Sequence, residues 1–334
     1  MKRSLLKKLI IGGAIILATA SNILGDQKPA EKESQLERQA LSVKRDPFVP
    51  PKNIQYILRQ EARIVKSLEE LTRRLEKDGF DKKQVQDAYG DERFIVHREI
   101  IRYFDGSPET KGAKGIISYE KYKENLGLKE KLDRAPSFMK QYKEKLALAE
   151  KTFGVDKRYI VAILGIESDF GNNKGKFYTF NALASMYTTR KKKDFAYREL
   201  KEYWVMCKNN NKGLFDYKSS YAGALGNAQF IPSSFNRLFI DGNGDLVADP
   251  LGMEDCIQSV ANYLKKSGWN PKANGKIPYA KSRNWEAIRS YNDSSFYVKA
   301  VIELATKSKW NADDLKSVAS GIEADSSKEA LSKI

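Results

Sequence analysis

The stretch DKRYIVAILGIESDFG, residues 156–171, joins an unbroken apolar run to a carboxyl group that follows it directly. In helical register the run YIVAILGI, which begins at Tyr159, is apolar on every side, so it predicts a helix buried all round from about 156 to 168. Glu167 is then expected at the buried end of this helix. A carboxyl group placed there loses hydration, which disfavours its charged form and raises its pKa. The stretch therefore predicts a core helix that ends in a group suited to proton transfer near neutral pH.

A second carboxylate would be needed for ordinary glycoside hydrolysis, in which two carboxyl groups flank the cleaved bond. Asp169 is close in sequence, but two residues along a helix correspond to about 200° of rotation, so it is not expected to face the same substrate as Glu167. If the substrate is a sugar, Glu167 is expected to work without a carboxylate partner, because a neighbouring N-acetyl group can stabilise the developing positive charge. The alternative for Glu167 is a structural role, in which it pairs with a lysine or caps a neighbouring element.

Helical periodicity continues on both sides of this stretch, whereas strand-like alternation is scarce. The sequence therefore predicts a mainly α-helical fold. The expected helices cover about 53–79, 82–88, 94–104, 137–154, 156–168, 194–207, 232–239, 254–267 and 293–306.

Composition limits the class of protein less sharply. The chain has 334 residues, 41% of them hydrophobic, which is enough for a sizeable core. The formal net charge of +16 favours anionic partners such as cell-wall polymers, although a lysine-rich surface that only aids solubility explains it equally well. A nucleic-acid-binding motif is not recognisable, so no nucleic-acid partner is expected. Cys207 and Cys256 leave two alternatives open, a disulfide or two free buried thiols.

The first twenty residues have the three parts of a secretory signal peptide. A basic start is followed by the apolar run LIIGGAIILATA and by an A-x-A site at 18–20, so cleavage is expected after Ala20, with Gly25 as the alternative. A membrane anchor is disfavoured because a span needs about 20 apolar residues. With no cysteine nearby for lipid attachment, we expect an exported, periplasmic protein that is not a lipoprotein and has no transmembrane span after processing.

A second informative segment is SSYAGALGNAQFIPSSF, residues 219–235. Small residues dominate its first half and allow a backbone to come close to a ligand. Ser220 and Gln229 offer hydrogen bonds, and Tyr221 and Phe230 offer flat apolar faces. The alternative is a tight packing that glycine permits, which explains the glycines but not the polar and aromatic groups among them.

Four separated motifs now resemble one family, the lytic murein transglycosylase B family of lysozyme-like lytic transglycosylases. In chain order they are ESDFG at 167–171, AGALGNAQFIPSS at 222–234, SVANYL at 259–264 and YN at 291–292. The resemblance covers about residues 120–306, and the region before about 115 resembles the family only weakly. It implies a lysozyme-like, SLT-type α-helical catalytic domain with an EF-hand-like metal loop.

The resemblance also implies an activity. Glu167 matches the family's single catalytic glutamate, which acts as general acid and then as base to cleave the bond between N-acetylmuramic acid and N-acetylglucosamine and form a 1,6-anhydro ring. The positions that match the family's glycan groove are Ser220, Gln229, Tyr263, Tyr291 and Asn292. The basic run 190–193, with Arg190 and Lys191, lies where the family has basic residues near the substrate's peptide, and its alternative is a solvated charged loop.

The loop DGNGDLVADP, residues 241–250, corresponds to the family's metal loop. Its oxygen-bearing positions are those that Ca²⁺ prefers, and the candidate ligands are Asp241, Asn243, Asp245, Val247 through its backbone, and Asp249. The loop departs from the pattern, since Leu246 replaces the usual glycine and Gly252 stands where a bidentate acid is expected. A weak structural Ca²⁺ or Na⁺ site is narrowly preferred over a turn that binds nothing. No cofactor is expected for the chemistry.

We therefore divide the chain into a signal peptide (1–20), a flexible linker (21–50), an N-terminal helical subdomain (51–115), a lytic transglycosylase catalytic domain (116–310) and a polar tail (311–334). The protein is expected to be a monomer. Its expected partners are peptidoglycan strands and cell-wall synthesis proteins. Two other functions stay open. One is a muramidase that uses water in the same site, and the other is an inactive scaffold that only binds peptidoglycan.

Overall fold

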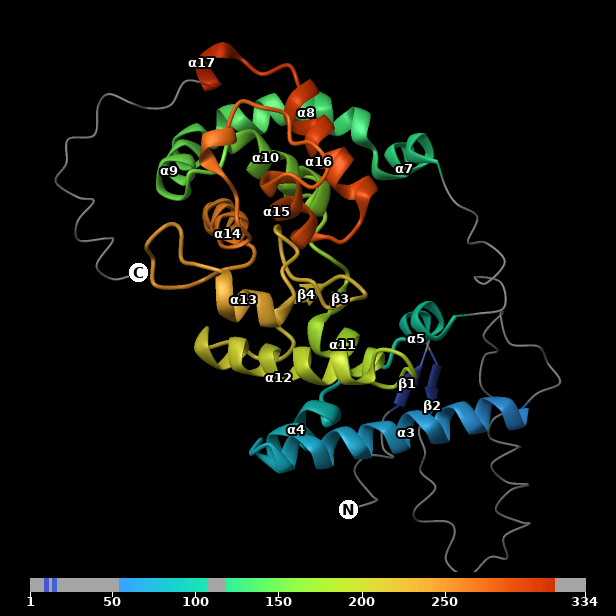
Figure 1. Cartoon of the computed structure of the whole chain (residues 1–334). Coiled ribbons are helices and arrows are strands. Elements are labelled where there is room, and N and C mark those ends of the chain that lie inside the picture. Colours follow the sequence, from blue (N-terminus) through green and yellow to red (C-terminus); the bar gives the residue numbers. More distant parts are fainter. Residues whose placement is uncertain (1–8, 12–13, 17–53, 107–117, 316–334) are drawn as a thin grey trace, which may run out of the picture. The chain divides into compact units, whose positions relative to one another are not determined.

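The computed structural model describes residues 9–11, 14–16, 54–106 and 118–315, and helices make up most of this part (Figure 1). The mainly α-helical class is thus confirmed. The contacts divide the chain into two units, unit 1 with residues 1–116 and 174–237, and unit 2 with residues 117–173 and 238–334. Whereas the sequence predicts one domain over 116–310, residues 174–237 therefore share a unit with the N-terminal helices. The expected linker, most of the expected signal peptide and nearly all of the polar tail lie outside the described residues.

Unit 1 combines helices with two small antiparallel pairs of strands. Near the N-terminus, β1 (Leu9–Ile11) pairs with β2 (Ala14–Ile16), and further along β3 (Phe177–Tyr178) pairs with β4 (Lys218–Ser219), with Phe177 opposite Ser219. Its helices are α3 (Ile54–Lys77), α4 (Lys82–Gly90), α5 (Arg98–Asp105), α11 (Thr179–Tyr187), α12 (Lys193–Asn209) and α13 (Pro232–Leu238), which ends at the unit boundary.

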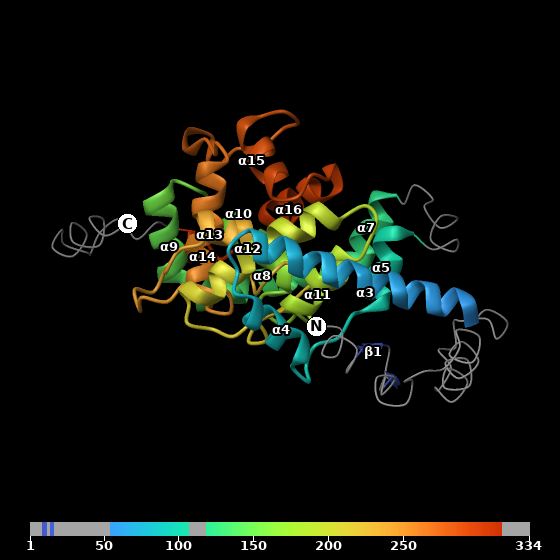
Figure 2. The same cartoon turned by 90° about the horizontal axis from the view of Figure 1, so that it is seen from below.

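The core of unit 1 is α11, of which every residue is buried. Helices α3, α5 and α12 and both strands β3 and β4 contact it, and Figures 1 and 2 show α12 alongside. The sequence pattern misses this helix because TFNALASMY is short and places polar residues among apolar ones. Most of those polar groups are satisfied inside, for example by the hydrogen bond that Ser185 Oγ donates to Asn181 O at 2.6 Å, whereas Asn181 Oδ1 is buried without a hydrogen-bond partner.

Unit 2 is built around α10 (Lys157–Ser168), on which α8, α9, α14 and α16 pack. The run from Tyr159 to Gly165 is buried throughout, so the predicted all-round burial of this helix is confirmed. Both views show α14 beside α9. The other elements are α7 (Tyr119–Leu126), α8 (Leu128–Gln141), α9 (Lys143–Phe153), α14 (Met253–Lys266), the short 3₁₀ helix η1 (Pro271–Ala273), α15 (Arg283–Tyr291), α16 (Ser295–Lys307) and α17 (Ala312–Leu315).

Two predicted helices have other bounds in the structure. The single helix expected over 137–154 is two helices, because the backbone turns at Tyr142 (φ −110°, ψ 27°) between α8 and α9. Helix α8 begins nine residues earlier than expected and tolerates Pro136, which lacks an N–H and normally discourages a helix prediction. The helix expected over 94–104 begins only at Arg98. The residues before Arg98 are not helical, and two of them, Phe94 and Val96, are buried.

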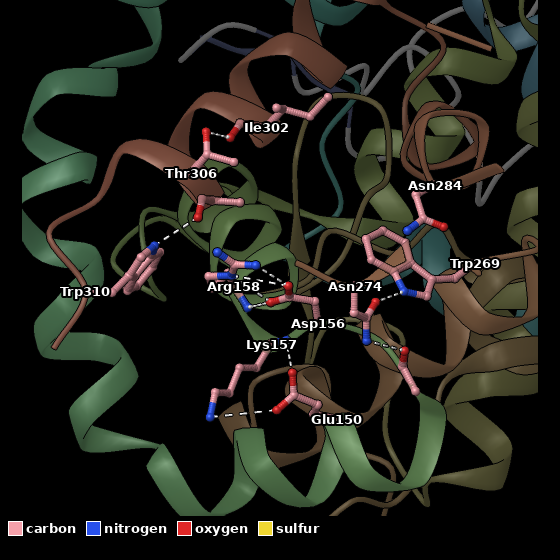
Figure 3. A network of polar contacts seen from close by, with 12 residues as sticks. Glu150, Asp156, Lys157, Arg158, Trp269, Asn274, Asn284, Ile302, Thr306 and Trp310 are labelled. Carbon is pink, nitrogen blue, oxygen red and sulfur yellow. Dashed lines mark hydrogen bonds and ion pairs between the residues drawn. The ribbon is translucent and has the colours of Figure 1, made fainter. Parts of the chain in front are cut away.

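A polar network holds the start of α10 (Figure 3). Asp156 is the N-cap, accepting a hydrogen bond from the Arg158 backbone N–H at 3.0 Å, and it also binds the Arg158 guanidinium. Lys157 is buried and pairs with Glu150 across 3.7 Å. Burial raises the pKa of Glu150, while the Lys157 N–H and charge act in the opposite direction. Each buried charge at this end of the helix therefore has an oppositely charged neighbour.

The two cysteines are free buried thiols. Cys207 Sγ lies 3.7 Å from Gly213 O, and Cys256 Sγ lies 3.3 Å from Pro250 O. Of the two alternatives that the sequence leaves open, the structure therefore has the free thiols. Among the described helices, none is both long and apolar enough to cross a membrane.

Candidate active site

The motif ESDFG forms the end of α10 and the turn that follows it. Asp169 and Phe170 both have left-handed backbone (φ 57° and 59°), and their N–H groups donate to Gly165 O and Leu164 O, which closes the helix with a left-handed (αL) cap. The Phe170 ring folds back onto the helix, where a Cβ at Gly165 would lie 2.7 Å from it. Ser168 Oγ accepts the Gly171 N–H at 3.0 Å and fixes the turn. The last four residues of the motif thus form a rigid support for its first residue, Glu167.

Glu167 lies in the last turn of α10 and is half-buried. Burial raises the pKa of its carboxyl group to about 7, against a hydrogen bond from Tyr297 that lowers it. The Tyr297 hydroxyl, on α16, donates this bond to Glu167 Oε1 at 2.6 Å. The group is therefore protonated for much of the time near neutral pH, as a general acid must be.

Other tyrosines of unit 2 surround this carboxyl group. Burial and the negative charge of Glu167 raise the pKa of Tyr122, which lies on α7. The same two causes raise the pKa of Tyr291, at the end of α15, well above its usual value. Tyr263, on α14, packs against Tyr291 with ring centroids 4.7 Å apart and donates a hydrogen bond to Ser290 O at 2.6 Å. The structure therefore places the predicted Tyr291 near Glu167 and the predicted Tyr263 against Tyr291. Asn292 follows Tyr291 as the C-cap of α15 and is exposed.

Asp169 is engaged elsewhere, as a counter-ion. Partial burial opposes its ionisation, but hydrogen bonds from Arg134 and Lys131, with their charges, outweigh this and lower its pKa to about 2. The Lys131 Nζ–Asp169 Oδ1 distance is 2.6 Å. The sequence argument against Asp169 assumes that it continues the helix, which is wrong, because its left-handed backbone ends α10. Its ion pairs, not its angular position, make it a poor partner for Glu167.

Ser220 and Gln229 lie in unit 1, in a segment that is a pair of tight turns rather than a helix. Ser220 N–H donates to Ala224 O at 2.9 Å, and its Oγ accepts the Ala224 N–H at 3.2 Å. Gln229 has left-handed backbone (φ 51°) and donates from Nε2 to Gly226 O at 2.8 Å. Gly223 is needed here, because a Cβ at this position would lie 2.6 Å from the Leu183 side chain. The segment thus presents two polar side chains from a fixed backbone.

Arg190 and Lys191 are both exposed in the turn before α12. The Arg190 N–H donates to Asp105 Oδ1 at 2.7 Å, which ties this turn to the end of α5. The basic run is therefore anchored through its backbone while its first side chains stay accessible.

The loop expected to bind a cation is held by its own hydrogen bonds. The Asp241 carboxylate accepts the N–H groups of Gly244 and Leu246, each at 2.7 Å. Asp255, buried at the start of α14, accepts the N–H groups of Gly242 and Asp249, each at 2.9 Å. Among the described residues, no three side chains of the His, Cys, Asp and Glu types gather to hold a metal ion. Cation binding by Asp241, Asn243, Asp245, Val247 and Asp249 stays a prediction.

Sequence reasoning missed Tyr297, the residue that contacts Glu167 directly. In helical register Tyr297 lies among the apolar residues of α16, so it resembles a core residue. The one available signal is its position six residues after Tyr291, in the segment that follows the YN motif. Tyr122 was missed because α7 has no buried apolar face to mark it as a helix.

Comparison with known proteins identifies the family of this chain. The family model of the transglycosylase SLT domain matches residues 64–278. Membrane-bound lytic murein transglycosylase B of Escherichia coli is 28% identical over 213 residues, which cover 60% of this chain and 58% of that protein. The chain therefore matches less than two thirds of the length of that relative.

Solved structures confirm the fold. Soluble lytic transglycosylase SltB1 from Pseudomonas aeruginosa is similar with a TM-score of 0.62 at 24% identity, covering 72% of this chain and 97% of that chain. The Escherichia coli lytic transglycosylase Slt35 in complex with calcium has a TM-score of 0.62 at 22% identity, with 72% and 92% covered. SltB3 from Pseudomonas aeruginosa in complex with NAG-anhNAM-pentapeptide has a TM-score of 0.63 at 21% identity, with 75% and 82% covered. The lysozyme-like helical fold expected from the sequence is thus confirmed.

Proposed function

This chain belongs to the transglycosylase SLT domain family, and from this membership and the Glu167 site we propose that it is a peptidoglycan lytic transglycosylase. It cleaves the β-1,4 bond between N-acetylmuramic acid and N-acetylglucosamine and leaves a 1,6-anhydro ring. The observation that carries the proposal is the half-buried Glu167 carboxyl, whose pKa burial raises to about 7. The curated relative and the solved structures of SltB1 and Slt35, which are lytic transglycosylases by name, support the same activity.

The reaction needs one proton carrier. Protonated Glu167 donates its proton to the glycosidic oxygen, and the bond from C1 of the muramic acid to that oxygen breaks. The substrate's N-acetyl oxygen stabilises the positive charge that develops at C1. The Glu167 carboxylate then removes the proton from the 6-hydroxyl, whose oxygen bonds to C1. No water is consumed, and Glu167 ends as it began, protonated.

Neighbouring groups support this use of a single carboxyl group. Tyr297 holds Glu167 Oε1 through its 2.6 Å hydrogen bond and so orients the carboxyl group in both protonation states. Asp169, paired with Lys131 and Arg134, is committed as a carboxylate and is a poor second acid or base. A water-using muramidase with Asp169 as helper is the weaker alternative for this reason.

The side chains proposed to bind the glycan are those that the sequence predicts. Ser220 and Gln229 in unit 1 are partly exposed. In unit 2, Tyr291 lies near Glu167, Tyr263 packs against Tyr291, and Asn292 follows Tyr291 in the sequence. The exposed Arg190 and Lys191 suit the carboxylates of a peptide attached to the strand. The complex of SltB3 with NAG-anhNAM-pentapeptide supports a substrate that carries both sugar and peptide.

The proposed place of action is the periplasm, with the mature protein soluble or peripherally associated with the wall. The basic start, the apolar run and the A-x-A site of the first twenty residues support export. The name of the curated relative, a membrane-bound transglycosylase, is compatible with peripheral association of this chain with a membrane. Export is tested by sequencing the N-terminus of the protein recovered from the periplasmic fraction.

A digest of purified peptidoglycan, read by mass spectrometry, tests the activity. Muropeptides that end in 1,6-anhydromuramic acid are expected with the wild-type protein and not with Glu167→Gln. Reducing ends, which carry one more water, would instead establish a muramidase. Sedimentation with the wall but no soluble product from either protein would establish a binding scaffold. Glu199→Gln, which alters a buried glutamate bonded to Ser233 in unit 1, is the control for loss of a buried carboxyl group elsewhere.

A further inference from the structure

Three aromatic residues of unit 1 gather at its surface, Tyr103 and Phe104 from the end of α5 and Tyr221 from the tight turn after β4. Each ring contacts the other two, with centroids 4.4 Å apart for Tyr103–Tyr221, 5.1 Å for Tyr103–Phe104 and 5.8 Å for Phe104–Tyr221. Tyr103 and Tyr221 are 59% and 39% exposed. Two large rings therefore stay in contact with water although the fold brings them together from positions far apart in sequence.

The arrangement is held in place from both sides. Tyr221 lies in the turn closed by the hydrogen bonds between Ser220 and Ala224, and Gly223 gives that turn its left-handed backbone (φ 82°). On the other side, Asp105 follows Phe104 and binds both the Arg190 N–H and the Arg63 guanidinium. The rings are thus presented by two fixed backbones, which lowers the entropy lost when a ligand binds.

The chemistry of the surface selects one kind of ligand. The Tyr221 hydroxyl donates to the Tyr103 hydroxyl at 2.9 Å, so the Tyr103 O–H can donate outward and the Tyr221 oxygen can accept. A flat apolar face bordered by such hydroxyl groups matches a pyranose ring, which has an apolar C–H face and hydroxyl groups around its edge. Ser220, next to Tyr221 in the same turn, is already among the residues proposed to bind glycan.

We propose that Tyr103 and Tyr221, supported by Phe104, form a sugar-binding subsite for the glycan strand. It rests on the proposed function for the identity of the strand. Its consequence is a preference for long strands over short ones, which follows from additional ring contacts.

The test compares a peptide-free peptidoglycan tetrasaccharide with an octasaccharide. Tyr103→Ala is expected to lower kcat/KM for the octasaccharide about fivefold to tenfold, through KM, and to leave the tetrasaccharide value within about twofold. Tyr103→Phe keeps the ring and should retain most of the preference for the longer strand. Tyr279→Ala removes another exposed ring (76% exposed, in unit 2) and is the matched control for loss of a surface tyrosine.

A second measurement separates this subsite from the chemistry. Calorimetric binding of the octasaccharide to Glu167→Gln, with and without Tyr103→Ala, reports the subsite even if the wild-type protein cleaves nothing. A loss of affinity with Tyr103→Ala alone supports the inference. Equal affinity in both proteins, or an equal loss for both strand lengths, would overturn it, and equal affinity would point to a protein partner for the rings. Unchanged melting temperatures of the variants exclude misfolding as the cause.

Discussion

The two ends of α10 both bury carboxyl groups, but they compensate them differently. At the N-terminal end Asp156 binds the Arg158 guanidinium and Glu150 lies beside Lys157, so buried charges are matched by opposite charges (Figure 3). At the C-terminal end Glu167 has the neutral Tyr297 as its hydrogen-bond partner, and burial raises its pKa to about 7. An oppositely charged neighbour favours the charged form of a carboxyl group, whereas burial beside a neutral partner favours the protonated form, which can give its proton away.

Asp169 shows how local this difference is. It lies two residues after Glu167, yet Arg134 and Lys131 lower its pKa to about 2. The same helix end therefore holds one carboxyl group that exchanges protons near neutral pH and one that stays charged. The following predictions test that contrast, beginning with the largest effect.

Glu167→Gln should lower kcat on peptidoglycan by about 10²- to 10⁴-fold, because the amide cannot donate and recover the proton. Initial rates of anhydro-muropeptide release measure this loss. The variant should remain folded by circular dichroism, since the amide still accepts the Tyr297 hydrogen bond. Residual activity within tenfold of wild type would show that another group carries the proton.

Asp156→Ala should destabilise the protein by about 1–3 kcal/mol, because it removes the N-cap of α10 and leaves Arg158 without its partner. Urea unfolding measures this change. The matched control is Asp293→Ala, which breaks the exposed pair with Arg289 and should cost less than about 0.5 kcal/mol. The pH profile of activity should not move. Equal stability of the two variants would remove the structural role assigned to the N-terminal end.

The stability of the wild-type protein relative to Glu167→Gln should fall by about 3 kcal/mol as the pH rises from about 4.5 to 8. The folded-state pKa of Glu167 is raised to about 7, so above its ordinary value the unfolded chain has lost the proton that the folded protein still holds. Ionisation then favours unfolding until the pH passes the folded-state pKa. Urea titrations of both proteins across this range measure the difference. A constant difference would mean that the pKa of Glu167 is ordinary.

Tyr297→Phe should lower kcat about threefold to tenfold and move the alkaline limb of the pH profile upward. The hydroxyl lowers the pKa of Glu167, so its removal lets that pKa rise and keeps the acid protonated to higher pH. The ring, and with it most of the packing, is retained. A drop in kcat with an unshifted limb would indicate a packing role only.

Calcium should have the smallest effect. Since Asp241 and Asp255 already accept the loop's own N–H groups, we expect Ca²⁺ to raise the melting temperature by less than about 2 °C and EDTA to leave activity unchanged. Differential scanning calorimetry with and without the ion is sufficient. A larger shift, abolished by Asp241→Asn, would show that the loop rearranges to bind the cation.

The buried helix α10 and its terminal acid could be predicted from the sequence because both depend on the pattern of neighbouring residues along the chain. The apolar run at 159–166 predicts a buried helix, and the carboxyl group that follows it must end in a poorly hydrated place. The same reasoning missed α11, in which most buried polar groups are hydrogen-bonded to the groups around them, and the break at Tyr142 that separates α8 from α9. Neither feature has a periodic signal.

Contacts between distant residues depended on the tertiary structure alone. Glu167 is separated from Tyr297 by 130 residues, and Tyr103 from Tyr221 by 118. The reason why Asp169 is a poor partner for Glu167 also changed, because the ion-pair partners of Asp169, Lys131 and Arg134, come from another helix. From sequence alone follow the helical class, the buried helix and the position of its acid, since each depends on neighbours along the chain. The proton affinity of that acid, the partner that orients it and the surface rings follow only from the fold, because burial and pairing are properties of side chains brought together in space.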